Sequence, residues 1–326
     1  MSTPSDASPS AVLRRVDATV PARSRTRYVV CAATAMFLVG TLAAVSDVIE
    51  SYPVYGGQAL RYLAAAVILL VVARLRGLGR VRLGLREWAL LAALALTGLV
   101  AFNVCVIEAT RAAGPSLVGI ILGTVPLALA VLGPLTGTLT GLLTGQPTSG
   151  KAGGGRPLPS PRIVVAALVV VAGATVATGA GSGNLSGLMW SLGALACEVC
   201  FSLLALPLLP KLGPVRVSAY SVALAVPFLL VIGLVVDGPG ILRVPTPAEA
   251  LGLGYLAMIV TTVAFFLWYT ALPGLGADRA GLFAGMIPIG AIITAAVLGL
   301  GLPSAADVAG AAIVIGGILL GLKPPK

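Results

Sequence analysis

Long apolar runs, separated by short polar segments, dominate the pattern of the chain from about residue 28 onward. A helix needs about 20 mostly apolar residues to cross the core of a bilayer. The runs lack the alternation of polar and apolar positions that is typical of barrel strands. Because lipid offers no partners to an exposed backbone, we expect helices. The expected fold is therefore an all-α integral membrane protein with ten spans, at 28–45, 54–73, 88–107, 116–136, 163–180, 188–209, 217–236, 250–271, 280–300 and 306–322.

The composition agrees with a membrane environment. Of the 326 residues, 58% are hydrophobic and only 10% are charged, whereas a soluble domain carries about 25% charged residues. The net charge of +10 does not indicate nucleic acid binding, because the basic residues lie between apolar runs. The polar segment 1–27 is expected to be a disordered cytoplasmic tail. It is not a signal peptide, because the next apolar run is too long for one.

The positions of Lys and Arg predict the orientation. If the N-terminus lies in the cytoplasm, all but three of the 21 Lys and Arg residues fall on the cytoplasmic side. Cytoplasmic loops attract these residues during insertion. Adding or removing one span in the middle of the chain would destroy the bias. The pattern therefore favours ten spans in the cell (cytoplasmic) membrane, with both termini inside.

The fourth and ninth spans share the pattern Gly-x-x-x-Gly-x-[Val/Ile]-Pro, and Val-Ala-Phe precedes both. Five spans in each half would place the second half upside down, as in transporters built from inverted repeats. The glycines allow close helix packing, and the prolines can bend helices that line a pathway. We expect one repeat at 28–181, with a flexible cytoplasmic linker at 141–162, a second at 185–322, and a cytoplasmic tail at 323–326. The shared residues, assigned a gating or structural role, are Gly119, Gly123, Pro126, Gly281, Gly285 and Pro288.

Several segments resemble the EamA-like transporter family of the drug/metabolite transporter (DMT) superfamily. Pro53 is followed by Ala-x-Arg61-x-x-x-Ala, which is similar to the second span of that family. Phe102-Asn103 with the later Gly-Pro pair is similar to the end of its third span, and the proline-rich segment 207–214 resembles the sixth-span exit of some members. The resemblance implies two five-helix repeats around a central cavity. It also implies efflux of a small organic solute, such as an amino acid, an amine or a drug-like metabolite.

Ionisable groups inside a membrane are costly and usually face a cavity. Glu198, near the middle of the sixth span, is the clearest case. It would serve as a proton-coupling or cation-binding group, or as a neutral carboxyl bonded between helices. Asn103 could bind the substrate or hold two helices together. Glu108, one turn before Arg111, could pair with that residue or face the exit of the cavity.

Two further groups are candidates. Arg61 and Gln58 share a helix face, and we expect Arg61 to form a gating or structural ion pair with Asp47 or Glu50 rather than a substrate contact. Aromatic residues cluster in the eighth span, where they could stack on a substrate. The cluster comprises Phe265, Phe266, Trp268 and Tyr269. For Trp268 and Tyr269, a place in an aromatic belt at the membrane interface is slightly favoured.

Other chemistry is not indicated. The chain has no histidine, and Cys197-x-x-Cys200 in an apolar helix is typical of packing, so no metal or cofactor is expected. We predict a secondary transporter and not an enzyme, with a small-molecule substrate, membrane lipid and protons as partners. The oligomeric state is left open. The alternatives are a flippase for lipids or lipid-linked sugars, a membrane enzyme using the sparse outer groups Glu108, Arg111 and Arg243, and a non-transporting subunit.

Overall fold

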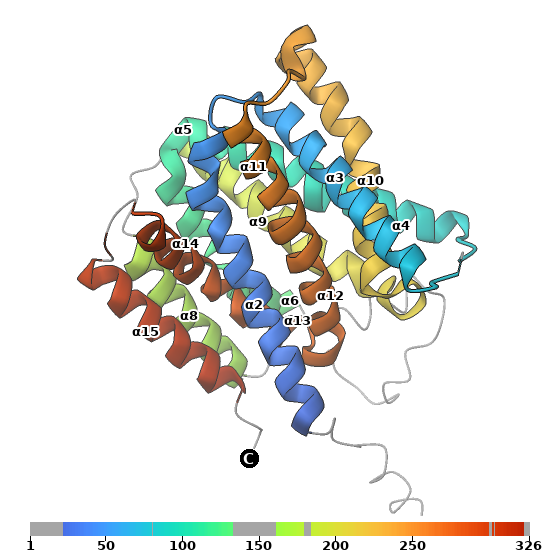
Figure 1. Cartoon of the computed structure of the whole chain (residues 1–326). Helices are drawn as coiled ribbons and strands as arrows, with labels where there is room; N and C mark the ends of the chain where they lie inside the picture. The colour runs from blue at the N-terminus through green and yellow to red at the C-terminus, as the bar shows by residue number, and fades with distance from the viewer. Residues whose placement is uncertain are drawn as a thin grey trace, which may run out of the picture.

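The computed structural model describes residues 22–79, 81–132, 161–178, 184–299, 302 and 304–322. Helices make up nearly all of this part of the chain, and no strand occurs in it. The helices run side by side as one bundle (Figure 1). The expected tails and most of the expected linker 141–162 lie outside the described residues.

Within the described part, a helical stretch occurs at each of the expected places. The elements are α2 (Ala22–Ser46), η1 (Asp47–Ile49), α3 (Val54–Leu75), α4 (Leu85–Ala95), η2 (Leu96–Ala101), α5 (Phe102–Leu122), α6 (Val125–Leu132), α8 (Pro161–Thr178), α9 (Leu185–Ala205), α10 (Leu209–Val236), η4 (Gly238–Ile241), α11 (Pro247–Tyr255), η5 (Leu256–Val263), α12 (Ala264–Leu275), α13 (Ala277–Gly281), η6 (Leu282–Gly285), α14 (Met286–Val297) and α15 (Ala305–Leu322).

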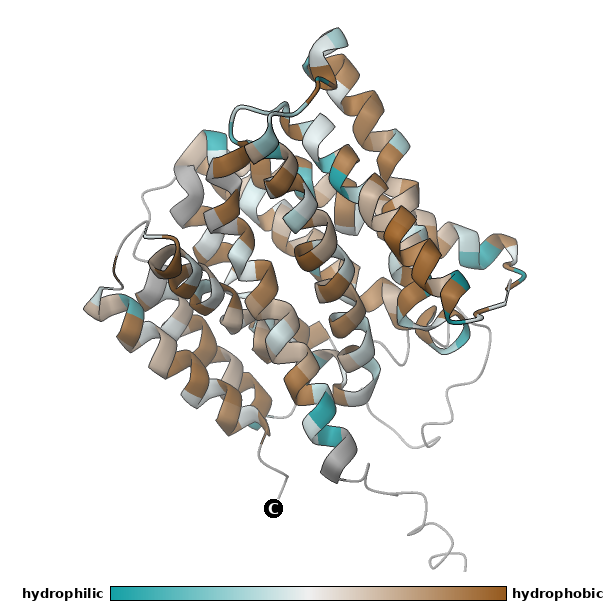
Figure 2. Ribbon diagram, in the orientation of Figure 1, coloured by the Kyte–Doolittle hydropathy of each residue, from teal (hydrophilic) through white to brown (hydrophobic). Residues whose placement is uncertain are grey.

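Seven helical stretches in the described residues are long and apolar enough to cross a membrane. Shorter apolar helices follow at Leu117–Leu132 and Pro161–Val176. Brown, hydrophobic residues cover the outer sides of the bundle, and the teal, hydrophilic ones gather near its ends (Figure 2). The chain is therefore a multi-pass membrane protein, while ten crossings and the orientation stay predictions.

The charged residues define two ends of the bundle. Arg25 of α2 donates to the Leu322 carbonyl of α15, and Arg162 of α8 donates to Leu320 O at 3.0 Å. These contacts place the start of α2, the start of α8 and the finish of α15 together, at the end that we call the basic end. Among the described cations, Arg111 and Arg243 lie at the opposite end, and Arg61 lies between the two. This segregation is what cytoplasmic loops require.

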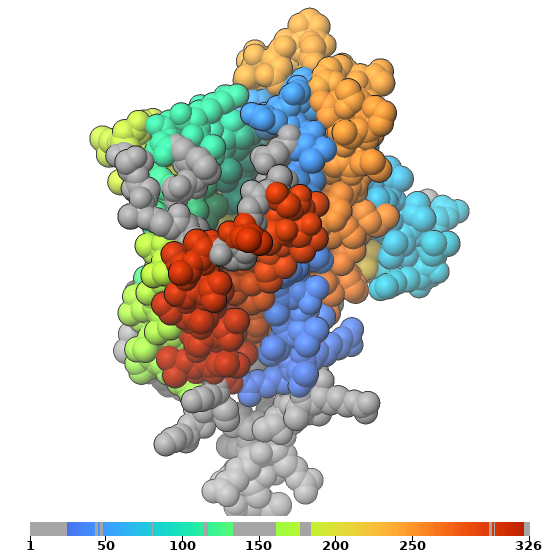
Figure 3. Space-filling model, turned by 60° about the vertical axis from the view of Figure 1, so that its left-hand side comes forward, coloured from blue at the N-terminus to red at the C-terminus, as the bar shows by residue number. Residues whose placement is uncertain are grey.

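Helices of the two expected halves pack against each other in a reciprocal pattern. α3 packs on α10, α6 on α13, and α8 on α15, so second, fourth and fifth spans meet seventh, ninth and tenth. α2 packs on α12 and α14, and α9 packs on α5 and η2. The contacts of α2, the first span, with the eighth and ninth spans thus correspond to the contacts of α9, the sixth span, with the third and fourth spans. Figure 3 shows α8 and α15 side by side along one face.

Both expected halves also deviate from regular α-helix at matching places. η2 and η5 are π-helical, and each ends next to the Val-Ala-Phe match. The Gly-Pro stretches interrupt their helices: a turn at Gly123–Thr124 separates α5 from α6, and the 3₁₀ stretch η6 precedes α14. Pro126 and Pro288 each lie in the first turn of the new helix, where a missing N–H costs little. Single π-helical turns are frequent at functional sites.

The sixth span is shorter than expected. α9 ends at Ala205, and a turn at 206–208 leads into α10. Gly213, with φ of 70° and ψ of 169°, breaks the first turns of α10. Three prolines in 207–214 and this left-handed glycine end the helix at the basic end.

Candidate functional site

Arg61 lies between the two halves and is only 6% exposed. Its Nε donates to Thr261 Oγ1 of η5 at 2.6 Å, and its Nη1 donates to Gln58 Oε1 at 3.1 Å. The Gln58 contact confirms that these side chains share a face. The expected ion pair with Glu50 is wrong, because Glu50 is exposed and Arg61 instead reaches a hydroxyl in the other half. The side chain of Asp47 lies outside the described part of the structure.

The guanidinium of Arg61 therefore faces neutral groups. Its Cζ lies 5.4 Å from the centroid of the Tyr62 ring, and no carboxylate pairs with it among the described side chains. A buried charge without a counter-ion is costly. Such a residue inside a membrane points to function by default.

Asn103 connects α5 to α3. Its Nδ2 donates to Tyr62 Oη at 3.0 Å and to the Leu99 carbonyl of η2 at 2.6 Å. These bonds match the interpretation in which Asn103 holds two helices together. They also place Asn103, Tyr62 and Arg61 in one polar layer beside the π-helical stretches.

Glu198 lies half-buried in α9. Its carboxyl has no hydrogen-bond partner among the residues that the structure describes, so the interpretation as a carboxyl bonded between helices finds no support there. The hydroxyl of Tyr269 lies within electrostatic reach of both Glu198 and Tyr62. The Tyr269 hydroxyl therefore couples electrostatically both to Glu198 of the sixth span and to Tyr62 of the polar layer.

Aromatic rings of α9 and α12 surround this region. Phe201 lies 5.0 Å from Phe265 and 5.1 Å from Tyr269 between ring centroids. Trp268 and Tyr269 are 2% and 0% exposed. The aromatic-belt interpretation is therefore wrong for both residues, because α12 packs between α2 and α10 inside the bundle.

Two of these aromatic residues end in unpaired polar atoms. Trp268 Nε1 and Tyr269 Oη are buried without a hydrogen-bond partner. Buried polar atoms of this kind usually find a partner. Of the two, the Tyr269 hydroxyl is the one that lies within electrostatic reach of Glu198.

Two clefts open at the basic end on either side of Pro214. The first has a volume of about 370 Å³ and is lined by Arg76, Leu78, Phe266 and residues 210–216. The second, of about 440 Å³, is lined by Arg27, Tyr28, Leu209, Pro214, Tyr269, Thr270, Pro273 and Gly274. The second cleft thus extends from the basic end to the wall formed by Tyr269.

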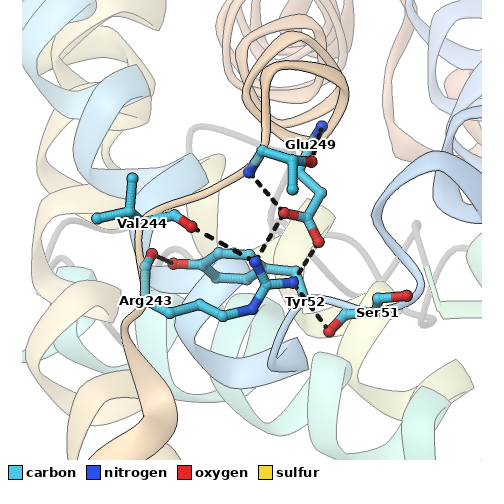
Figure 4. Close-up of polar contacts among 6 residues, drawn as sticks. Ser51, Tyr52, Arg243, Val244 and Glu249 are labelled. Carbon is cyan, nitrogen blue, oxygen red and sulfur yellow. Dashed lines mark hydrogen bonds and ion pairs between the residues drawn. The ribbon is translucent and has the colours of Figure 1, made fainter.

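A network of polar contacts lies at the opposite end (Figure 4). Both terminal nitrogens of Arg243 donate to the Glu249 carboxylate, Nη1 to Oε2 at 2.9 Å. Arg243 Nη2 also donates to the Ser51 carbonyl at 3.2 Å, and its Cζ lies 4.8 Å from the Tyr52 ring centroid. Tyr52 Oη donates to the Arg243 carbonyl at 2.7 Å. The network, which we call the Arg243 clamp, joins the segment before α3 to the segment before α11.

The clamp keeps its charges over the physiological pH range. The hydrogen bond to Glu249 raises the pKa of Arg243 above its ordinary value. A raised pKa of a cation stabilises the fold below that value, and the effect is lost only as the pH rises through it. Glu108 and Arg111, also at this end, form an ion pair at 2.8 Å, which was one of the two interpretations of Glu108, and both side chains are partly exposed.

The basic end contains an ion pair, Lys211–Glu87, that resembles the Arg243–Glu249 pair of the clamp but is more exposed. Glu87 of α4 accepts from the Gly84 backbone N–H and from Lys211 at the start of α10. Glu249 likewise accepts from the backbone N–H three residues earlier, that of Thr246, at 2.8 Å. Glu87 and Glu249 were not singled out from the sequence. The Thr-x-x-Glu capping box at 246–249 was the available signal.

Comparisons with known proteins agree with this architecture. A solved crystal structure superposes with a TM-score of 0.70 at 19% identity, over 91% of this chain and 96% of that chain, which shows the fold alone. The uncharacterized transporter YetK of Bacillus subtilis (strain 168) is 27% identical over 296 residues, or 88% of this chain and 84% of that protein.

The class defined by fold and comparison is thus a polytopic membrane transporter. Residues 183–322 match the model of the EamA-like transporter family. The relative aligns across both halves of the chain and is itself named as a transporter.

Proposed function

We propose that the protein is a secondary active transporter that exports a small organic solute by alternating access, with Glu198 coupling transport to protons. The substrate class that the family suggests is an amino acid, an amine or a drug-like metabolite. The substrate would bind between Glu198, the aromatic rings of Phe201 and Phe265, and the polar layer of Arg61, Tyr62 and Asn103.

The unpartnered carboxyl of Glu198 carries this proposal. A carboxyl in the interior of a membrane protein costs free energy unless it pairs, binds a proton or binds a cation. Glu198 has no hydrogen-bond partner in the described structure, and the Tyr269 hydroxyl near it has none either. A protonated substrate amine or a transported proton would satisfy the carboxyl.

The two ends of the molecule support alternating access. The second cleft leads from the basic end to Tyr269, while the Arg243 clamp joins the two halves at the opposite end. With the basic end in the cytoplasm, this arrangement corresponds to a transporter open inward. Rocking of two inverted halves would break the clamp and close the clefts.

A growth and uptake assay tests the proposal. Cells that overproduce the protein are compared with cells that overproduce Glu198→Gln, on a panel of toxic amino acid analogues and amines, with and without an uncoupler. Increased tolerance to one solute, lost with the uncoupler and in the variant, is the expected result. Unchanged tolerance across the panel, in cells shown to contain the protein in the membrane, would argue against small-solute export.

A further inference from the structure

We propose that the first cleft at the basic end binds the phosphate group of an anionic phospholipid, with the attached chain against Phe266. This inference does not depend on the proposed transport function. It assigns a lipid site at a place where neither Glu198 nor the polar layer is involved.

Three cations line the cleft from two directions. Arg76 comes from the segment after α3, and Lys211 and Arg216 come from the start of α10. Glu87 pairs with Lys211. Among the described residues, Arg216 donates only to the backbone carbonyls of Leu212 and Gly79. The cleft therefore carries more positive than negative charge. A phosphate could accept from Arg76 and Arg216 without displacing any carboxylate.

The guanidinium of Arg76 is positioned at the cleft by a cation–π contact with Phe266. Its Cζ lies 5.4 Å from the centroid of the Phe266 ring, so the guanidinium is oriented although it remains exposed. No carboxylate pairs with Arg76 among the described side chains.

The walls of the cleft change from cationic to apolar. Phe266 lies in the first turn of α12, well inside the spanning segment Pro247–Leu275. Leu212 and Val215 add further apolar wall. A ligand that fills the cleft thus meets charge at the rim and hydrocarbon below, which is the arrangement of a phospholipid at the boundary of headgroup and chain. The volume of about 370 Å³ falls within the usual range of ligand sites.

Basic pockets between membrane helices on the cytoplasmic side are known to bind anionic headgroups. Positive loops alone would attract such lipids diffusely. A concave site with an aromatic floor makes a sharper prediction, namely that Arg76 and Arg216 matter more than neighbouring arginines outside the cleft.

The test uses the full-length protein, purified in detergent and depleted of lipid. Thermal unfolding and native mass spectrometry measure binding of phosphatidylglycerol, phosphatidylcholine with the same chains, glycerol 3-phosphate and inorganic phosphate. Phosphatidylglycerol should raise the unfolding temperature and phosphatidylcholine should not. Arg76→Gln and Arg216→Gln should each weaken phosphatidylglycerol binding about fivefold, as expected for one cation near a headgroup. The double variant should weaken it further.

Arg74→Gln is the matched control, because Arg74 is exposed on the same helix end and does not line the cleft. It should bind phosphatidylglycerol like the wild type. Equal losses in Arg74→Gln and Arg76→Gln would overturn the proposal in favour of diffuse attraction. Binding of glycerol 3-phosphate or phosphate as strong as that of the lipid would assign the cleft to a soluble phosphate compound and overturn the lipid site. Unfolding temperatures without lipid show that each variant is folded.

Discussion

Glu87 and Glu249 occupy corresponding positions at opposite ends of the molecule. The same number of residues separates Glu87 from Glu249 as Gly123 from Gly285. Each glutamate accepts from a backbone N–H three residues before it. Glu87 binds Lys211 of the other half, whereas Glu249 binds Arg243 of its own half, which also donates to the Ser51 carbonyl in the first half. The side chains of Glu249 and Arg243 are 5% and 38% exposed, whereas those of Glu87 and Lys211 are 26% and 45% exposed. Under the proposed alternating-access mechanism, the two ends of the molecule should carry related contacts with unequal burial of this kind.

Replacing Glu198 by Gln should separate coupling from binding. The amide keeps the shape of the side chain but cannot carry a proton across the membrane. In proteoliposomes, uphill transport of a substrate driven by a pH gradient should be lost, while exchange of labelled for unlabelled substrate persists. Glu108→Gln, which affects a partly exposed pair worth about 0 to 1 kcal/mol, should keep both activities. Gradient-driven transport that survives in Glu198→Gln would remove Glu198 from the coupling step.

Arg61→Met should retain the fold and lose transport. Replacing a buried charged group with an apolar one of similar size is often neutral or stabilising by about 1 to 4 kcal/mol. We therefore expect an unfolding temperature no lower than that of the wild type, with transport reduced at least about tenfold if Arg61 acts in gating or substrate contact. Arg61→Lys keeps the charge without the fork and should transport at an intermediate rate. Full activity in Arg61→Met would assign Arg61 a packing role only.

Gly290→Ala should destabilise the contact between α2 and α14. A Cβ at this position would lie 2.1 Å from the Phe37 carbonyl oxygen, and one at Gly40 would lie 2.0 Å from Ile287 O. These contacts involve backbone atoms, so the helices must separate. Overpacking of this kind costs about 1 to 3 kcal/mol. The control is Gly316→Ala, because nothing lies within 4 Å of the added Cβ. Equal unfolding temperatures for the two variants would contradict the close approach.

The sequence predicted an all-helical, multi-pass membrane protein because long apolar runs report directly on the bilayer, while the ten crossings and the orientation stay predictions. It also placed Gln58 beside Arg61 and Glu108 beside Arg111. It failed for Trp268 and Tyr269, because hydropathy does not distinguish a helix face toward lipid from a face toward other helices. It failed for the partner of Arg61 because Thr261 lies 200 residues away in the chain. No local pattern indicates such a contact.

Alternating access between related halves is tested most directly by thiol accessibility. The four native cysteines are replaced by alanine. A single cysteine is then introduced at Leu253, which is buried in α11 one turn after Glu249, or at Thr270, which lines the second cleft. Labelling by a water-soluble maleimide is then measured in the Glu249→Gln and Glu87→Gln backgrounds. Glu249→Gln should raise labelling at position 253 and lower it at position 270, and Glu87→Gln should not raise it at 253. Labelling that rises at both positions together, or at neither, would contradict reciprocal opening of the two ends.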